Sequence, residues 1–266
     1  MFHQILILSL ALFGASQASP QKWGWIGAAS NPFFPVKPYI VGGDIVEGRE
    51  FPSQISLRVE NSHNCGGSIL NSEWILTAGH CSDYSPSELN VVEGSNLLDN
   101  GGVSHQVVEI RVHEKFDPSD SWINDIAIMK VSPPIEMRDG VAPVKLPKKG
   151  QETPAGSTAT VIGWGRTSAW GPIPNELRKV EIPIVDYVKC NSTYYEDGNT
   201  VRPTQICAGG EGGKDACNGD SGGPLFVNGE IIGIVSWGRP CAEKGYPTVF
   251  TEVSDYIDWI EEHLKA

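Results

Sequence analysis

The segment DACNGDSGGPL, from Asp215 to Leu225, holds the most specific pattern in the chain. Ser221 is flanked by small residues, which would let a carbonyl group approach its hydroxyl. Gly219 can present a backbone N–H beside that of Ser221, and such a pair of donors can hold an oxyanion. A serine hydroxyl is a poor nucleophile without a base. The segment therefore predicts a nucleophile whose partners lie elsewhere in the sequence.

Two upstream motifs can supply those partners. His80 in LTAGHC is a candidate base, and Asp125 in NDIAIMK precedes an apolar run that is typical of a buried strand. A buried aspartate can fix the tautomer of an imidazole and stabilise its charged form. Taken singly, each residue has a structural interpretation instead: the serine could form a turn, the histidine could pack beside a disulfide, and the aspartate could cap a strand or lie in a solvated loop. Together, the order His, Asp, Ser matches one known order of a catalytic triad.

The rest of the chain shows short apolar or alternating runs broken by Gly, Pro, Asn and Asp, which favours an all-β sandwich or barrel. The alternating runs are Ile55-Leu57-Val59 and Val108-Ile110-Val112, and the more continuous ones are ATVIG and EIIGIVSW. Only the C-terminal SDYIDWIEEHLK has helical spacing. It places Ile257, Ile260 and Leu264 on one face, with Ser254 as the expected N-cap.

Six motifs in their expected order resemble the trypsin/chymotrypsin serine protease family: IVGG, LTAGHC, NDIAIMK, GWG, GDSGGP and SWG. The resemblance covers residues 40–266. Gly79 stands where the family usually has alanine, and Ile128 where leucine is usual. The resemblance implies a chymotrypsin-like fold of two antiparallel six-stranded β-barrels, about 40–150 and about 151–266, with a C-terminal helix. It also implies a serine endopeptidase that works through an acyl-enzyme at the triad His80, Asp125 and Ser221.

Composition and the N-terminus indicate an exported protein. The 266 residues carry a net charge of −12, which argues against nucleic acid or an anionic membrane as partner. Residues 1–18 read as a signal peptide, because a short apolar run leads into small residues. Residues 19–39, rich in Pro, Gly and aromatic residues, read as a propeptide. We expect a secreted, extracellular protein with the protease domain at 40–266.

Six cysteines after a signal peptide predict three disulfides, and the absence of a Cys-x-x-Cys pair makes zinc a poor alternative. Their spacing leaves the pairing open. The family resemblance implies Cys65–Cys81, Cys190–Cys207 and Cys217–Cys241. Asn191 begins a glycosylation sequon, Asn-Ser-Thr. The sequence predicts no metal and no cofactor.

The IVGG motif predicts a zymogen. In the family, a cut before this isoleucine frees an ammonium that pairs with the aspartate preceding the nucleophile. Here these residues are Ile40 and Asp220. Tyr39 stands where arginine or lysine is usual. We therefore expect an activating protease that accepts an aromatic residue and cuts at Tyr39–Ile40.

Substrate preference rests on four positions. The resemblance places Asp215 at the base of the specificity pocket, which implies cleavage after Arg or Lys, as in trypsins. Gly238 should leave the pocket mouth open, and Ser236 to Gly238 should pair with substrate backbone. Thr248 stands where trypsins and chymotrypsins have glycine, so a chymotrypsin- or elastase-like preference is the alternative.

The resemblance also implies the partners. We expect protein or peptide substrates, the activating protease and protein protease inhibitors, acting on a monomer, with digestion as the default role. The alternative from another class is a non-catalytic protease homologue that acts as a binding module. Such homologues usually lose a triad residue, and this chain keeps all three.

Overall fold

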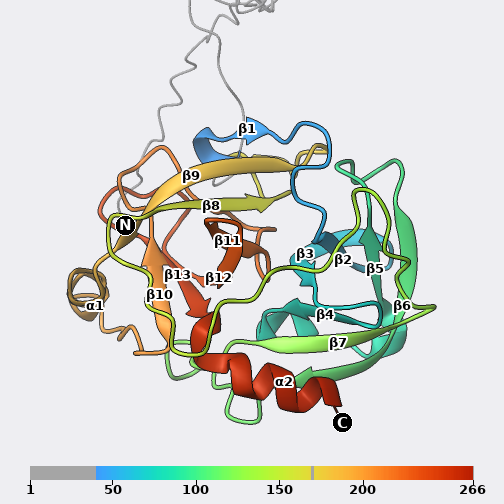
Figure 1. The fold of residues 1–266 in the computed structure, drawn as a ribbon. Helices are drawn as coiled ribbons and strands as arrows, with labels where there is room; N and C mark the ends of the chain where they lie inside the picture. Colours follow the sequence, from blue (N-terminus) through green and yellow to red (C-terminus); the bar gives the residue numbers. More distant parts are fainter. Residues whose placement is uncertain (1–39, 169–170, 266) are drawn as a thin grey trace, which may run out of the picture. The chain divides into compact units, whose positions relative to one another are not determined.

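The computed structural model describes residues 40–168 and 171–265, so the expected signal peptide (1–18) and propeptide (19–39), Tyr39 included, lie outside the described residues. The described chain forms two closed antiparallel β-barrels and a short C-terminal helix (Figure 1). The predicted fold class is therefore confirmed. No helix within these residues is long and apolar enough to cross a bilayer.

The first barrel contains six strands in the order β2-β3-β4-β7-β6-β5. Their bounds are β2 (Gln54–Val59), β3 (Ser62–Ile69), β4 (Trp74–Thr77), β5 (Leu89–Glu93), β6 (Val103–Val112) and β7 (Ala127–Ser132). The alternation predicted at residues 55–59 is real, since Ile55 and Leu57 are fully buried in the barrel core. Burial of such side chains supplies most of the barrel's stability.

The second barrel closes because β8 pairs with both β9 and β11. Its six strands are β8 (Thr158–Gly163), β9 (Arg178–Val185), β10 (Gln205–Ala208), β11 (Pro224–Val227), β12 (Glu230–Trp237) and β13 (Thr248–Glu252). A two-residue strand, β1 (Asp44–Ile45), pairs with β9 as a seventh member of this sheet. The sequence-based boundary counted these residues with the first barrel. They join the second because Ile40 is buried in its core.

Strand β6 shows why the predicted alternation Val108-Ile110-Val112 is wrong in detail. A β-bulge interrupts the pairing with β7 between Val107 and Glu109. A bulge adds one residue and so changes which face the following side chains occupy. Val107 is buried, whereas Val108 is 49% exposed.

The observed helices match those predicted from the sequence only in part. Helix α2 (Ile257–Lys265) buries Ile257 and Ile260 against the core of the first barrel. It follows the 3₁₀ turn η4 (Val253–Tyr256), so Ser254 lies inside that turn and is not an N-cap. Helix α1 (Tyr187–Tyr195) was not predicted.

Helix α1 lacks the apolar stripe that would reveal it, because only Cys190 and Tyr194 are buried. Its start is marked by a cap, in which the Asp186 side chain accepts a hydrogen bond from the backbone N–H of Lys189. The disulfides are Cys65–Cys81, Cys190–Cys207 and Cys217–Cys241, the pairing that the family resemblance implies.

Candidate active site

His80 lies on a 3₁₀ turn, η2 (Gly79–Ser82), directly after β4. The disulfide between Cys65 on β3 and Cys81 anchors this turn to the barrel. The imidazole is partly exposed, with 18% of its side chain accessible. Trp122 meets it edge-on at 5.3 Å between ring centroids. His80 therefore combines a fixed backbone with a solvent-facing ring edge, as a general base requires.

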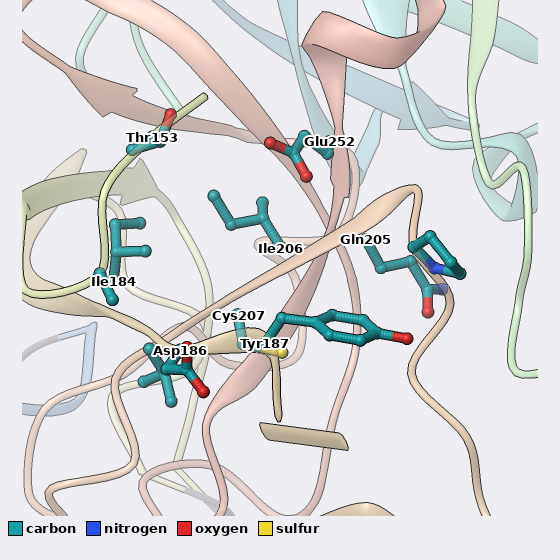
Figure 2. A pocket seen from close by; sticks show the side chains of 11 residues that line it. Thr153, Ile184, Asp186, Tyr187, Gln205, Ile206, Cys207 and Glu252 are labelled. Atoms are coloured by element: carbon teal, nitrogen blue, oxygen red, sulfur yellow. The ribbon is translucent and has the colours of Figure 1, made fainter. Parts of the chain in front are cut away.

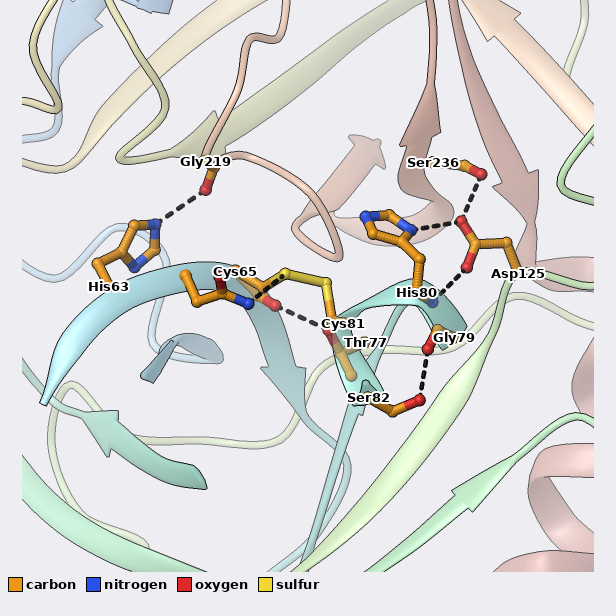
Figure 3. Close-up of a disulfide and its surroundings, with 12 residues drawn as sticks. His63, Cys65, Thr77, Gly79, His80, Cys81, Ser82, Asp125, Gly219 and Ser236 are labelled. Atoms are coloured by element: carbon orange, nitrogen blue, oxygen red, sulfur yellow. Dashed lines mark hydrogen bonds and ion pairs between the residues drawn. A yellow bond between two sulfur atoms is a disulfide. The ribbon is translucent and has the colours of Figure 1, made fainter. Parts of the chain in front are cut away.

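Asp125 is fully buried and holds His80 by two bonds (Figure 3). Its Oδ2 lies 2.8 Å from Nδ1 of His80, and its Oδ1 accepts from the His80 backbone N–H at 2.9 Å. Because a carboxylate can only accept here, Nδ1 carries the proton and Nε2 keeps its lone pair. The Ser236 hydroxyl, from the second barrel, also donates to Oδ2 at 2.6 Å.

Ser221 lies in a segment of the second barrel that packs against the first barrel. Its carbonyl accepts a hydrogen bond from the backbone N–H of Gly66 at 2.8 Å, next to the Cys65–Cys81 disulfide that anchors His80. A side chain at Gly222 would collide with the Thr77 hydroxyl. The nucleophile segment thus lies flat against β3 and β4. The Ser221 hydroxyl makes no hydrogen bond within the described residues, which is common before substrate binds.

Two backbone N–H groups, those of Gly219 and Ser221, indicate an anion-binding site. Neither Gly219 nor Ser221 donates its N–H to an acceptor in the described part of the chain. Gly219 has φ +100°, which L side chains rarely adopt, and a side chain there would press on Gly165. Free N–H groups in a rigid loop can stabilise a developing oxyanion.

His63 is a residue of the site that the sequence analysis did not identify. Its Nε2 lies 2.8 Å from the carbonyl of Gly219 (Figure 3). Its Nδ1 lies 2.9 Å from the Ser56 hydroxyl. Burial lowers the pKa of His63 to about 4, so the ring is neutral at pH 7. Because a carbonyl oxygen only accepts, Nε2 donates to it and orients the peptide group between Gly219 and Asp220. Its partner is 156 residues away, and no sequence pattern marked the pair.

Asp220 and Ile40 are both completely buried in the second barrel. The Asp220 carboxylate accepts from the backbone N–H of Gly165 at 2.7 Å and of Cys217 at 2.9 Å. Burial raises the pKa of Asp220 to about 7, against the opposing effect of those two bonds. The Val41 carbonyl accepts from the Asp215 N–H at 3.1 Å, so the IVGG segment packs beside the nucleophile loop.

The four predicted substrate-binding positions lie together, although in different roles. Ser236, Gly238 and Thr248 line a cavity that also contains Ser221. The Ser236 hydroxyl is committed to Asp125, which leaves its backbone for substrate. Asp215 lies behind Thr248, whose hydroxyl donates to its Oδ1 at 2.7 Å. Asp215 itself is only 2% exposed.

The remaining candidates lie away from this site. The Asn191 side chain, on α1, is partly buried and accepts from the Val201 N–H at 2.9 Å, and its glycosylation stays a prediction. A separate cavity of about 360 Å³ opens near the end of β13 (Figure 2). It contains the half-buried Glu252, and its wall includes Ile184 and Ile206.

Comparisons with known proteins agree with this geometry. Residues 40–260 match the family described as Trypsin. A trypsin from Phaedon cochleariae is 39% identical over 90% of this chain and 94% of its own length. Trypsin alpha-4 from Lucilia cuprina is 41% identical over 83% of this chain and 86% of its own length. Trypsin 5G1 from Aedes aegypti is 36% identical over 97% of this chain and 97% of its own length. With the fold, the paired His80 and Asp125 and these relatives, the chain belongs to the trypsin family and is a serine endopeptidase.

Proposed function

We propose that the protein is a secreted endopeptidase that hydrolyses peptide bonds through an acyl-enzyme on Ser221. Two observations support the proposal: Asp125 holds Nδ1 of His80 and leaves Nε2 free, and the backbone N–H groups of Gly219 and Ser221 have no acceptor within the described residues. Asp125 holds the imidazole in the tautomer that accepts a proton.

The reaction follows in two stages. His80 Nε2 takes the Ser221 proton as the oxygen attacks the substrate carbonyl carbon. The N–H groups of Gly219 and Ser221 hold the resulting oxyanion. The carbon–nitrogen bond then breaks, and His80 returns the proton to the leaving amine. A water molecule, deprotonated by His80, attacks the ester and releases the acid, while the proton passes back to Ser221.

The chain is proposed to be made as a zymogen. Removal of residues 1–18 would release it from the secretory machinery, and a cut at Tyr39–Ile40 by another protease would complete it. The new ammonium at Ile40 would neutralise Asp220, whose buried carboxylate has two backbone donors and no described cation partner. An uncompensated buried charge is costly, so its pairing can set the shape of the adjoining loop.

Two substrate preferences are candidates. Asp215 and the likeness to proteins named trypsin support cleavage after Arg or Lys. The hydrogen bond from Thr248 to Asp215 supports the alternative, a chymotrypsin- or elastase-like preference for uncharged side chains. Protein protease inhibitors as partners, a monomeric state and a digestive role remain predictions from the family resemblance.

A small serine-directed reagent tests the function independently of substrate preference. Diisopropyl fluorophosphate should label Ser221 once the chain starts at Ile40. The variant Ser221→Ala should lose labelling and at least about 10⁴-fold of the activity on unfolded casein. An activated chain that folds but neither labels nor hydrolyses casein would instead be a non-catalytic binding module.

A further inference from the structure

The cavity near the end of β13 is separate from the site around Ser221. Its volume is about 360 Å³, and pockets that bind small molecules typically enclose about 300–1,000 Å³. Among the residues that the structure describes, none lines both this cavity and the one beside Ser221. Glu252 here and Thr248 there both lie on β13, about 13 Å apart along the strand. The larger cavity therefore has no part in the chemistry at Ser221.

The walls of this cavity are largely apolar (Figure 2). Ile184 comes from the end of β9, Ile206 from β10 and Ala155 from the segment between the two barrels. Ile184 and Ile206 are themselves part of the core of the second barrel, so this wall is held rigidly by the sheet. A rigid apolar wall favours a ligand with an apolar body, because contact removes apolar surface from water.

Glu252 supplies the charged group of the cavity. Its backbone N–H donates to the Thr204 carbonyl at 3.0 Å, which fixes the end of β13. Its half-buried carboxylate has no hydrogen bond and no ion pair within the described residues. In Figure 2 this carboxylate points toward the space between Thr153 and Ile206. A carboxylate that has lost part of its hydration without gaining a donor is costly, and a bound cation would remove that cost.

The charges that face Glu252 from neighbouring elements are negative. Asp255 on η4 and Glu152 in the segment between the barrels add to burial in raising the pKa of Glu252 to about 7. Among the described residues that line the cavity, none is a lysine, an arginine or a histidine. The local potential therefore attracts a cation once Glu252 is ionised.

The other titratable groups of the lining are already engaged. The Asp186 side chain accepts from the Lys189 N–H at 3.0 Å, and the Tyr187 hydroxyl donates to the Val201 carbonyl at 3.0 Å. Cys207 is closed in a disulfide. Calcium and magnesium need about six or more oxygen ligands, which one carboxylate and an apolar wall do not supply. An organic cation needs one counter-charge and an apolar surface, and the cavity offers both.

We infer that this cavity binds an organic cation on an apolar stem, an alkylammonium or alkylguanidinium group, which pairs with Glu252 and packs its stem against Ile184 and Ile206. Two sources carry this chemistry: the lysine or arginine side chain of a bound protein, and a free amine. The inference goes beyond the proposed function and does not rest on it, because the site shares no lining residue with the cavity at Ser221.

A matched set of small probes tests the inference. We would titrate ¹⁵N-labelled Ser221→Ala protein with n-butylammonium, the neutral butan-1-ol and the anionic butanoate at pH 8, and follow the amide signals by NMR. The signals of Ile206 and Glu252 should shift, and n-butylammonium should bind at least about 10-fold more tightly than butan-1-ol. Equal affinity for the three probes, or no shift at these amides, overturns the inference.

The affinity should also depend on pH in a defined direction. Glu252 must be ionised to pair with a cation, and with a pKa of about 7 its ionised fraction rises from about a tenth at pH 6 to about nine tenths at pH 8. The affinity for n-butylammonium should therefore rise about 10-fold over this range. Glu252→Gln should abolish this rise, which assigns it to Glu252 and not to Asp255. An affinity that is equal at pH 6 and pH 8 contradicts the inference.

Further variants locate the bound probe. Glu252→Gln keeps the shape of the cavity and should lose the preference for the cation over the alcohol. Ala155→Phe should fill the cavity and weaken the binding of both probes, so the test does not depend on one variant folding. Glu262→Gln, an exposed position on α2, makes the same change in net charge and should bind as wild type. Asp215→Asn should also bind as wild type. A folded Glu252→Gln or Ala155→Phe variant that binds n-butylammonium like wild type overturns the inference.

Hydrolysis of casein separates the two sources of the cation. If a lysine or arginine side chain of a protein substrate occupies the cavity, Glu252→Gln in the activated protein should raise KM for casein about 3-fold, leaving kcat unchanged. An equal KM in the two proteins assigns the cavity to a free amine. Only this comparison requires the proposed function. A chain that hydrolyses nothing but binds n-butylammonium at Glu252 overturns the endopeptidase and leaves the cation site in place.

Discussion

The Asp125 carboxylate accepts three hydrogen bonds, two from His80 and one from Ser236, and its backbone carbonyl accepts a fourth from Thr251. A completely buried charge requires such donors, since otherwise it would lose its hydration without compensation. The residue types of the candidate triad were predicted from motifs. The donors Ser236 and Thr251 could not be, because both come from the second barrel and lie more than a hundred residues along the chain.

His63 yields a prediction at the residue scale. A histidine with a lowered pKa contributes stability that is present above its unfolded pKa of about 6.5 and lost as pH falls through about 4. Against a His63→Gln variant, the wild-type protein should therefore lose about 2 kcal/mol of relative stability between pH 7 and pH 4, a figure that discounts its partial exposure. Denaturant unfolding at several pH values measures the difference.

Whether the hydrogen bond from His63 to the Gly219 carbonyl also affects catalysis is tested by measuring kcat, in His63→Gln and in a second variant. Glutamine can still donate to the Gly219 carbonyl, so His63→Gln should keep much of kcat. His63→Phe cannot donate and should lower kcat by about 10-fold with little change in KM. Equal kcat in both variants would mean that the bond to Gly219 is only structural.

At the scale of elements, the loop from Phe116 to Asn124 is held in an unusual conformation. Ser121, Trp122 and Asn124 have φ of +52°, +55° and +58°. Such strain persists only where surrounding contacts determine the backbone. The Gln205 side chain on β10 supplies them, with Nε2 at 2.8 Å from the Ser121 carbonyl and 3.4 Å from the Trp122 carbonyl. The loop presents Trp122 to His80 as a result.

Gln205→Leu should release this loop. Without its bonds to Gln205, Trp122 should leave its edge-on contact with His80, and KM should rise several-fold. Amide hydrogen exchange from residues 121–124 should accelerate by about 10-fold. Gln151→Leu, which removes a bond to Glu230, is the control and should change neither quantity. Unaltered exchange at residues 121–124 in Gln205→Leu would contradict the account.

Glu252, at the end of β13, is expected to reduce stability at neutral pH. Burial, with smaller contributions from Asp255 and Glu152, raises its pKa to about 7. A group with a raised pKa contributes stability that is present below its unfolded value of 4.5 and lost as pH rises through 7.

The variant Glu252→Gln should therefore be about 1–2 kcal/mol more stable than wild type at pH 8, after allowance for the partial exposure of Glu252. The two proteins should differ little near pH 4. Thermal unfolding at the two pH values measures this, with Glu262→Gln on α2 as an exposed control. A gain at pH 8 that persists at pH 4 would exclude titration as its cause.

Elements were predicted well where their pattern is local. Strands β2, β8 and β12 follow runs of apolar residues that the sequence displays. Helix α1 was missed because its burial is confined to one disulfide and one tyrosine, and β6 was misread because its bulge depends on the pairing with β7. Both errors arise where the local pattern is weaker than the tertiary contact.

For the whole molecule, both barrels contribute residues to the candidate site. His80 and Asp125 come from the first barrel, while Ser236 and the loop of Ser221 come from the second. The segment starting at Ile40 enters the second barrel beside that loop, although it is joined in sequence to the first. Processing at Ile40 would thus act on the second barrel directly.

Activation gives a prediction at this scale. A variant Tyr39→Arg, in a Ser221→Ala background to prevent self-digestion, can be cut before Ile40 with added trypsin. The cut chain should be about 3 kcal/mol more stable than the uncut chain at pH 7, because an ammonium would pair with Asp220. A paired amine has a raised pKa, so this gain is present below about 8 and lost as pH rises above the raised value.

Unfolding of cut and uncut chains between pH 6 and pH 10 provides the measurement. Asp220→Asn serves as the control, since it removes the acceptor charge and should abolish the difference between the two forms. Equal stability of cut and uncut protein at pH 7 would show that the new terminus stays outside the barrel.

The motifs around residues 80, 125 and 221 and the short apolar runs were enough to predict the chemistry, the fold class and, through the family resemblance, the disulfide pairing. Those features are encoded in residue types and in local spacing. Tertiary contacts alone reveal that the Thr248 hydroxyl donates to Asp215, that the N–H groups of residues 219 and 221 have no acceptor within the described residues, and that His63 holds the carbonyl of Gly219. Each of these features depends on which donor lies within about 3 Å of which acceptor across the sheets. A hydrogen bond weakens over fractions of an ångström. The order of residues in a sequence does not determine distances on that scale.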